Sequence, residues 1–261
     1  MSEAGNAGLI PAATIMLVRD GAAGLEVFMV VRHHKIDSFS GALVFPGGKV
    51  DKGDTHESVR ARIDGAEGLD DWEFSMRVAA IREAYEECGV LLAREERTGN
   101  LVDAARLMAL EPMREGLNKN ELQIGDLLEK GGLRIAADLL TPFAHWITPN
   151  LMPKRFDTRF YVAAAPQDHL AVHDGSESVD SVWIRPSDVI AELEAGKRTI
   201  VFPTRMNVLK LGRSQNVSHA IETARATPVV TVEPKIDGKV LRIPIEAGYD
   251  VTEEPLTNIR P

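Results

Sequence analysis

Three glutamates and an arginine lie close together in the segment 82–89, which reads REAYEECG. On a helix, Glu83, Glu86 and Glu87 are related by steps of three and four residues, so their carboxylates project from one face. The opposite face of that helix carries a set of apolar side chains: Ile81, Ala84, Tyr85 and Cys88. The pattern predicts a helix with a defined acidic stripe.

The acidic stripe has two interpretations. Like charges at this spacing cost an isolated helix only about 0.2–0.5 kcal/mol per pair, so a solvated surface would tolerate them. Carboxylates on one stripe also suit Mg²⁺ or Mn²⁺, which prefer hard oxygen ligands and commonly bridge substrate phosphates. Arg82 would then neutralise and orient one of the acids. The segment alone leaves both interpretations open.

A turn-forming sequence, Pro46-Gly47-Gly48, interrupts the apolar run 42–50 upstream of the acids. Proline removes a backbone donor and glycine permits unusual backbone angles, so the chain must turn or bulge there. The residues that follow, 51–68, are polar and contain glycine, and they predict a surface loop before the acidic helix begins.

The acidic helix is one of several helices and strands that the sequence predicts. Asp70 and Asp71 are placed to cap a helix whose spacing continues over 72–95, with an interruption at Gly89. Further helices are expected at 104–117, 119–132, 203–212 and 216–226, with a strand followed by a helix within 178–196. Strands are expected as a hairpin at 13–20 and 25–32, at 143–149 and 157–166, and as a hairpin within 228–245.

Composition narrows the class of protein. The 261 residues are 44% hydrophobic and 26% charged, the mixture of a folded globular chain. A formal net charge of −9 argues against broad binding of nucleic acid, although it leaves room for a small phosphorylated substrate. The single cysteine, Cys88, excludes an intrachain disulfide and a cysteine-rich zinc site.

Neither a signal peptide nor a run of 18 apolar residues is present, so the sequence predicts a cytoplasmic protein without a membrane span. With no repeat or low-complexity linker, we expect one domain over 1–261, with a core at about 10–215 and a C-terminal extension at 216–261. A homodimer is possible, and the sequence leaves the oligomeric state open.

The glycine turn and the acidic helix together resemble the Nudix box. That motif is glycine, five residues, glutamate, seven residues, and then Arg-Glu-aliphatic-x-Glu-Glu-x-Gly-aliphatic. Gly48 matches the opening glycine, and Asp54 stands where the family usually has glutamate. The closing half is matched in order by Arg82, Glu83, Ala84, Glu86, Glu87, Gly89 and Val90.

The spacing between the two halves of the box departs from the motif. Between Asp54 and Arg82 lie 82 − 54 − 1 = 27 residues instead of seven, which places an insertion at 55–81 within a box that spans 48–90. The insertion is expected to be a solvated surface loop followed by the start of a helix; alternatively, it could cover the bound substrate. This long insertion is similar to that of the Nudix branch which includes the mammalian peroxisomal acyl-CoA diphosphatases.

The resemblance implies a Nudix-type α/β/α sandwich with a mixed sheet and metal-dependent hydrolysis of a diphosphate linkage in a nucleoside-diphosphate derivative. CoA or acyl-CoA is the leading substrate, giving 3′,5′-ADP and (acyl-)phosphopantetheine. Another Nudix substrate (NADH, ADP-ribose or a nucleotide sugar) is the alternative, as is a nucleotide-sensing domain without catalysis. The implied cofactor is Mg²⁺ or Mn²⁺.

Site residues follow from the same resemblance. Glu83, Glu86 and Glu87 would be metal ligands, with the Gly47 carbonyl as a backbone ligand and Arg82 holding the carboxylates in register. Glu177 is the candidate for a further catalytic acid from a distant loop.

Predicted substrate contacts are Gly48 and three arginines, Arg32, Arg155 and Arg159, because guanidinium matches phosphate geometry. A strand-edge salt bridge is an equal alternative for each arginine. His145 is expected to pack beside Trp146 and not to bind metal, and Cys88 to fill the core.

Overall fold

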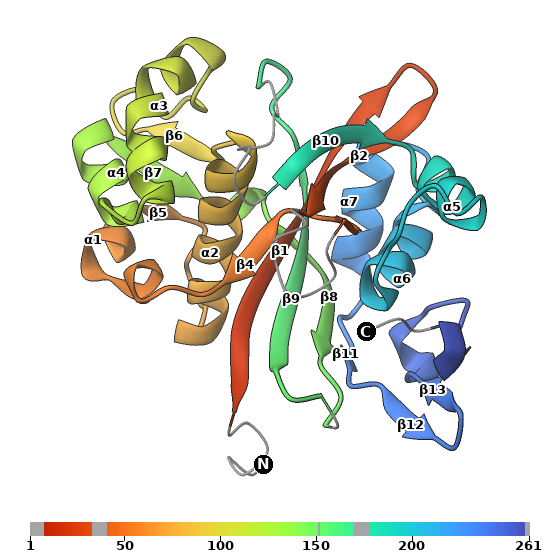
Figure 1. Cartoon of the computed structure of the whole chain (residues 1–261). Helices are drawn as coiled ribbons and strands as arrows, with labels where there is room; N and C mark the ends of the chain where they lie inside the picture. The colour runs from red at the N-terminus through yellow and green to blue at the C-terminus, as the bar shows by residue number, and fades with distance from the viewer. Residues whose placement is uncertain (1–7, 33–40, 151, 170–177, 259–261) are drawn as a thin grey trace.

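The computed structural model describes residues 8–32, 41–150, 152–169 and 178–258. Within them, eight strands form one mixed sheet with the order β10-β2-β1-β9-β8-β11, in which β3 also pairs with β2 and β4 with β1 (Figure 1). The bounds of these strands are β1 (Leu9–Gly21), β2 (Gly24–Arg32), β3 (Leu43–Val44), β4 (Gly47–Lys49), β8 (Thr141–Ile147), β9 (Arg155–Ala164), β10 (Ser178–Ile184) and β11 (Thr231–Val232).

Strand β1 is the centre of this sheet. It forms the predicted antiparallel hairpin with β2 and runs parallel to β9 from the pair Leu9 and Arg155 to the pair Val18 and Ala164. Successive side chains of β1 enter two different cores: Ile15 and Leu17 pack on one face of the sheet and Met16 on the other. A strand buried on both faces reads as a continuous apolar run, as IMLV does here.

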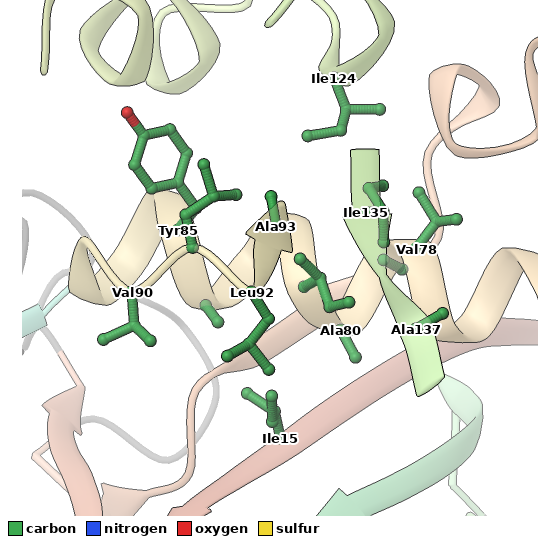
Figure 2. Close-up of a cluster of buried hydrophobic side chains, with 14 of the residues drawn as sticks. Ile15, Val78, Ala80, Tyr85, Val90, Leu92, Ala93, Ile124, Ile135 and Ala137 are labelled. Carbon is green, nitrogen blue, oxygen red and sulfur yellow. The ribbon is translucent and has the colours of Figure 1, made fainter. Parts of the chain in front are cut away.

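A helical lobe covers the first face of the sheet (Figure 1). Its helices are α1 (Glu57–Arg60), α2 (Asp71–Cys88), α3 (Ala104–Asn118) and α4 (Ile124–Gly131), with a small sheet in the order β5 (Ile63–Asp64), β7 (Leu133–Ala136) and β6 (Ala93–Glu95). Helix α2 is buried between sheet and lobe: Figure 2 shows Ile15 of β1 on one side of it, and Ile124 and Ile135 of the lobe on the other.

Three helices lie on the second face of the sheet: α5 (Pro186–Glu194), α6 (Phe202–Leu211) and α7 (Val217–Ala226). The chain then forms a second small sheet from β12 (Lys235–Asp237), β13 (Val240–Arg242) and β14 (Glu253–Pro255). Helices on both faces of a mixed sheet confirm the predicted α/β fold class. None of the helices in the described ranges is both long and apolar enough to cross a membrane.

The acidic helix begins where the sequence predicts and ends earlier than its spacing suggests. Asp70 is the N-cap, and its side chain accepts a hydrogen bond from the Glu73 amide at 2.7 Å. The predicted continuation to residue 95 is wrong, because Gly89 adopts a left-handed conformation with φ of 69° and ends the helix. The chain beyond it extends into β6.

The insertion 55–81 contains the helix start that the sequence predicts, since residues 71–81 belong to α2; it also contributes Val59 and Ile63 to the core, and β5 pairs with β7. In the expected extension at 216–261, α7 packs on the second face and β11 joins the main sheet. The predicted hairpin around Asp237 and Gly238 is present as β12 and β13.

Candidate metal and substrate site

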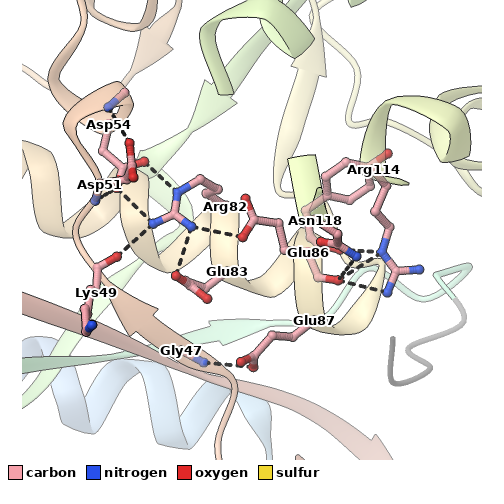
Figure 3. Close-up of polar contacts among 12 residues, drawn as sticks. Gly47, Lys49, Asp51, Asp54, Arg82, Glu83, Glu86, Glu87, Arg114 and Asn118 are labelled. Atoms are coloured by element: carbon pink, nitrogen blue, oxygen red, sulfur yellow. Dashed lines mark hydrogen bonds and ion pairs between the residues drawn. The ribbon is translucent and has the colours of Figure 1, made fainter. Parts of the chain in front are cut away.

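The last two turns of α2 carry the three glutamates (Figure 3). The apolar face of these turns is fully buried, as the side-chain pattern predicts, and it fixes which way the acids point. Glu83 is buried, with 9% of its surface exposed, whereas Glu86 and Glu87 are half-buried. The acids therefore line an accessible side of a helix whose other sides are packed in the core.

Arg82 holds two of these acids through one nitrogen atom. Its Nη1 donates to Glu83 Oε1 at 2.9 Å and to Glu86 Oε2 at 3.0 Å. Its Nη2 donates to the Lys49 carbonyl at 2.9 Å, and Nε and Nη2 donate to the two carboxylate oxygens of Asp54 at 2.8 and 3.0 Å. The predicted contact between Arg82 and the carboxylates is present, and Arg82 also ties the acidic helix to the glycine turn.

Asp54 is the buried anchor of Arg82. Its side chain is fully buried and also accepts the Asp51 amide at 2.7 Å, which closes the capping box of the short helix η2 (Lys52–Thr55). Burial raises the pKa of the Asp54 carboxyl, and the paired guanidinium opposes that shift. Burial by itself lowers the pKa of Arg82, but Asp54, Glu83 and Glu86 outweigh it and raise that pKa.

The glycine turn approaches the acids closely. The Gly47 amide donates to Glu87 Oε2 at 3.1 Å. A Cβ added to Gly48 would lie 2.4 Å from Glu83 Oε1, so only glycine lets the strand and the carboxylate come together. The structure thus brings Gly47 and Gly48 to the glutamates; a Gly47 carbonyl ligand and a Gly48 substrate contact stay predictions.

Arg159 lies on the same face of the sheet as α2. It pairs with Ala13 on β1, and Ala13 pairs with Gly48 on β4, so two strand spacings, about 10 Å, separate the Arg159 and Gly48 backbones. Its guanidinium is half-buried, and among the described residues its buried Nε has no hydrogen-bond partner. Arg159 is the predicted arginine that the fold brings toward the glycine turn.

The other predicted contacts are placed differently. Arg155 donates to Glu233 at 2.8 Å and to the Thr148 carbonyl at 3.0 Å, which is the salt bridge that the sequence left as an alternative. Arg32 ends β2, opposite Ser178, and only its backbone is described. Glu177 lies outside the described residues. For all three, a role in the site stays a prediction.

His145 and Cys88 are core residues. His145 is buried and lies between Asp157 Oδ1, 2.6 Å from its Nε2, and Thr231 Oγ1, 2.8 Å from its Nδ1. His145 is a packed residue, as the sequence predicts, although the sequence did not anticipate its polar partners. Cys88 is fully buried.

Arg114 of α3 contacts the end of α2, which the sequence did not predict. Its guanidinium donates to the carbonyls of Tyr85 and Glu86 at the end of α2 (Figure 3). The spacing of residues along α2 and α3 does not indicate this contact, because Arg114 follows Glu86 by 28 positions. The contact arises only when the lobe packs on α2.

The chemistry of the donors fits a hard divalent cation. The carboxylates of Asp54, Glu83 and Glu86 contact Arg82, and that of Glu87 accepts from the Gly47 amide, so hard oxygen donors gather at this end of α2 (Figure 3). Among the described residues, no three His, Cys, Asp or Glu side chains already surround a common point closely enough to hold a metal ion. Binding of one ion by all three glutamates therefore requires their side chains to move together.

The chain is similar to Nudix proteins in sequence and in structure. The family model of the NUDT19 Nudix domain matches residues 65–211, more than half of the chain. A crystal structure of a NUDIX hydrolase from Alicyclobacillus acidocaldarius superposes with a TM-score of 0.65 and 28% identity, covering 85% of this chain and 97% of that one.

Two curated relatives are similar over a smaller share of their own length. "Putative nudix hydrolase 7" of Caenorhabditis elegans is 29% identical over 72% of this chain and 56% of the relative. The acyl-coenzyme A diphosphatase NUDT19 of Xenopus laevis is 22% identical over 69% of this chain and 57% of the relative. The chain thus spans a little over half the length of these relatives. The matched domain and the shared fold show that the chain belongs to the Nudix family, as a member resembling NUDT19.

Proposed function

We propose that the protein hydrolyses a diphosphate linkage in a nucleoside-diphosphate derivative, with CoA or acyl-CoA as its substrate. The observation that carries the proposal is the acidic end of α2, where three glutamates and Arg82 meet the glycine turn. The preference for CoA rests on the inserted Nudix box and on the similarity to a relative named as an acyl-coenzyme A diphosphatase.

Glu83, Glu86 and Glu87 are the residues that would hold Mg²⁺ or Mn²⁺, with the Gly47 carbonyl as a further ligand. A bound divalent ion would neutralise the diphosphate and lower the pKa of a water molecule. Arg82, fixed by Asp54, keeps Glu83 and Glu86 on one side of the helix. Glu177 is proposed as the carboxylate that acts as a general base and takes the proton of the attacking water.

Arg159 is proposed to bind a substrate phosphate. Arg159 is half-buried, and within the described part of the chain its Nε has no acceptor, so a phosphate oxygen could supply one. In the reaction, the water oxygen bonds to one phosphorus atom as the bridging P–O bond breaks. With acyl-CoA the products are 3′,5′-ADP and acyl-phosphopantetheine.

Two alternatives have different consequences. Another diphosphate such as NADH, ADP-ribose or a nucleotide sugar would use the same acids and a different pocket. A sensing domain would bind nucleotide without turnover, yet it has no need for three acids and their arginine.

We also propose a cytoplasmic location and a homodimer, the latter to be measured by light scattering.

The test is hydrolysis of a panel of diphosphates, with CoA and acyl-CoA included, in the presence of Mg²⁺ or Mn²⁺. Glu86→Gln should lower turnover by more than about 100-fold, beyond the loss typical of residues outside the ligand set. Glu115→Gln is the matched control, because Glu115 is an exposed glutamate of α3 that pairs with Lys119, and it should retain full turnover. Binding of the diphosphates without turnover of any of them would overturn the proposal in favour of a sensor.

A further inference from the structure

The end of helix α2 is held by two side chains of helix α3. Arg114 Nε donates to the Tyr85 carbonyl at 2.7 Å, and its Nε and Nη2 reach the Glu86 carbonyl at 3.2 and 3.1 Å. Asn118 Nδ2 lies 3.4 Å from the same Glu86 carbonyl. The Tyr85 hydroxyl donates back to the Leu110 carbonyl at 3.0 Å, so the two helices are joined by polar contacts in both directions.

These contacts supply hydrogen-bond donors to the Glu86 carbonyl at the end of the helix. The last carbonyls of a helix have no amide of the following turn to bind. Here the Gly89 amide donates to Tyr85 and the Val90 amide to Ala84, as in a left-handed helix cap. The Val90 amide, which would have bonded to Glu86 in a longer helix, is thus already used, and Arg114 takes its place at the Glu86 carbonyl.

The same contacts place a positive charge where α2 has none of its own. The C-terminal end of a helix carries about half a negative charge, which cations stabilise. The last turn of α2 contains no basic residue and instead carries Glu86 and Glu87. Arg114 is mostly buried, with 12% of its side chain exposed, and it is itself paired with Glu111 at 3.1 Å.

We infer that Arg114 is a positioning residue for the metal site: it fixes the last turn of α2 and thereby the directions in which Glu86 and Glu87 point. The inference rests on the proposed function, since it assigns those acids to a divalent cation. It also gives the lobe a role, because Arg114 and Asn118 of α3 contact the backbone of α2 at Glu86.

The experiment is direct titration of the protein with Mn²⁺ in the absence of substrate, followed by calorimetry. Arg114→Ala should weaken Mn²⁺ binding by about 10-fold, the scale of outer-shell effects, as the last turn loosens. Loss of positive charge alone would act in the opposite direction and tighten cation binding, so the sign separates positioning from simple electrostatics. Arg114→Lys keeps the charge but not the planar fork, and it should recover only part of the affinity.

Arg106→Ala is the matched control. Arg106 lies on the same helix and also pairs with one acid, Glu95, and one carbonyl, that of Gly131, but both partners belong to the lobe. This variant should lose comparable thermal stability while its Mn²⁺ affinity stays within twofold of wild type. Amide hydrogen exchange at 86–90 should quicken in Arg114→Ala and not in Arg106→Ala.

Each other outcome has a distinct meaning. Mn²⁺ affinity in Arg114→Ala that is unchanged or tighter, with the same stability loss as the control, would overturn the inference. A wild-type protein that binds Mn²⁺ but hydrolyses no diphosphate would overturn the proposed function alone. A wild-type protein that binds no Mn²⁺ would overturn both.

Discussion

Arg82 shows how one residue can organise a site from several segments. Its guanidinium has partners on the acidic helix, on η2 and on the backbone of β4, and only 9% of its side chain is exposed. A buried charge is costly unless it is paired and hydrogen-bonded, and here every guanidinium nitrogen has an acceptor. Asp54, which replaces the glutamate usual in the motif, is short enough to do this from within a tight 3₁₀ turn.

The close approach of Gly48 to Glu83 gives a prediction at the same scale. In Gly48→Ala the new Cβ would lie 2.4 Å from Glu83 Oε1, so the carboxylate must move away from the turn. Because the φ of Gly48 is not positive, the backbone itself accepts alanine and the fold should persist. We expect turnover to fall by about 10–100-fold, measured as kcat/KM at saturating Mn²⁺.

Lys49→Ala serves as the control for that variant. Lys49 is the next residue of β4, its side chain is exposed, and the carbonyl that binds Arg82 is retained. Full activity in Gly48→Ala would show that Glu83 has room to relax and that its observed position is not needed.

At the scale of elements, a polar row joins three neighbouring strands. Asp157 of β9, His145 of β8 and Thr231 of β11 are linked by hydrogen bonds of 2.6 and 2.8 Å. For a neutral imidazole, a carboxylate acceptor at Asp157 places the proton on His145 Nε2, and Nδ1 then accepts from the Thr231 hydroxyl. β11 has only two residues, so this row is a main part of its attachment to the sheet.

Thr231→Val tests that attachment. The substitution keeps the β-branched shape and leaves His145 Nδ1 without its protein donor, so the free energy of unfolding should fall by about 1 kcal/mol in urea titrations. Thr227→Val, which loses an exposed hydroxyl contact to the Thr223 carbonyl at the end of α7, should change it by less than about 0.5 kcal/mol. Equal changes in the two variants would show that the row does not hold β11.

At the scale of the whole molecule, the two faces of the sheet have separate tasks. The first face carries α2 and the acids, whereas the second is covered by α5, α6, α7 and the segment that connects β13 to β14. Tyr249 joins that segment to the second face: its hydroxyl accepts from Trp146 Nε1 at 3.0 Å and donates to the fully buried Asn207 at 2.7 Å. Burial raises the pKa of the Tyr249 hydroxyl, so it stays protonated and able to donate at neutral pH.

Tyr249→Phe should therefore affect stability and not activity. It leaves a buried indole N–H and a buried amide oxygen unpaired, which should lower the free energy of unfolding by about 2 kcal/mol and shift the fluorescence of Trp146. The kcat/KM for the diphosphate should match that of wild type, because the second face lies across the sheet from the acids. A loss of activity with unchanged stability would contradict this division and give the C-terminal segment a part in the site.

Features that depend on local spacing could be predicted from the sequence alone. The acidic stripe, the apolar face behind it, the cap at Asp70 and the break at Gly89 all follow from a period of 3.6 residues and from glycine geometry, and the structure confirms them. The β1–β2 hairpin follows from an equally local pattern, whereas the α/β class was implied by the resemblance to the Nudix box.

The distant residues that contact these features could not be predicted from the sequence, because local spacing does not say how the chain packs. Asp54 reaches Arg82 across the inserted segment, Arg114 caps α2 from the lobe, and Arg159 comes near Gly48 because β1 lies between their strands. Such contacts depend on strand order and register and on how the lobe packs against the sheet. Those choices are fixed by burial of the whole apolar surface, which no short stretch of sequence encodes.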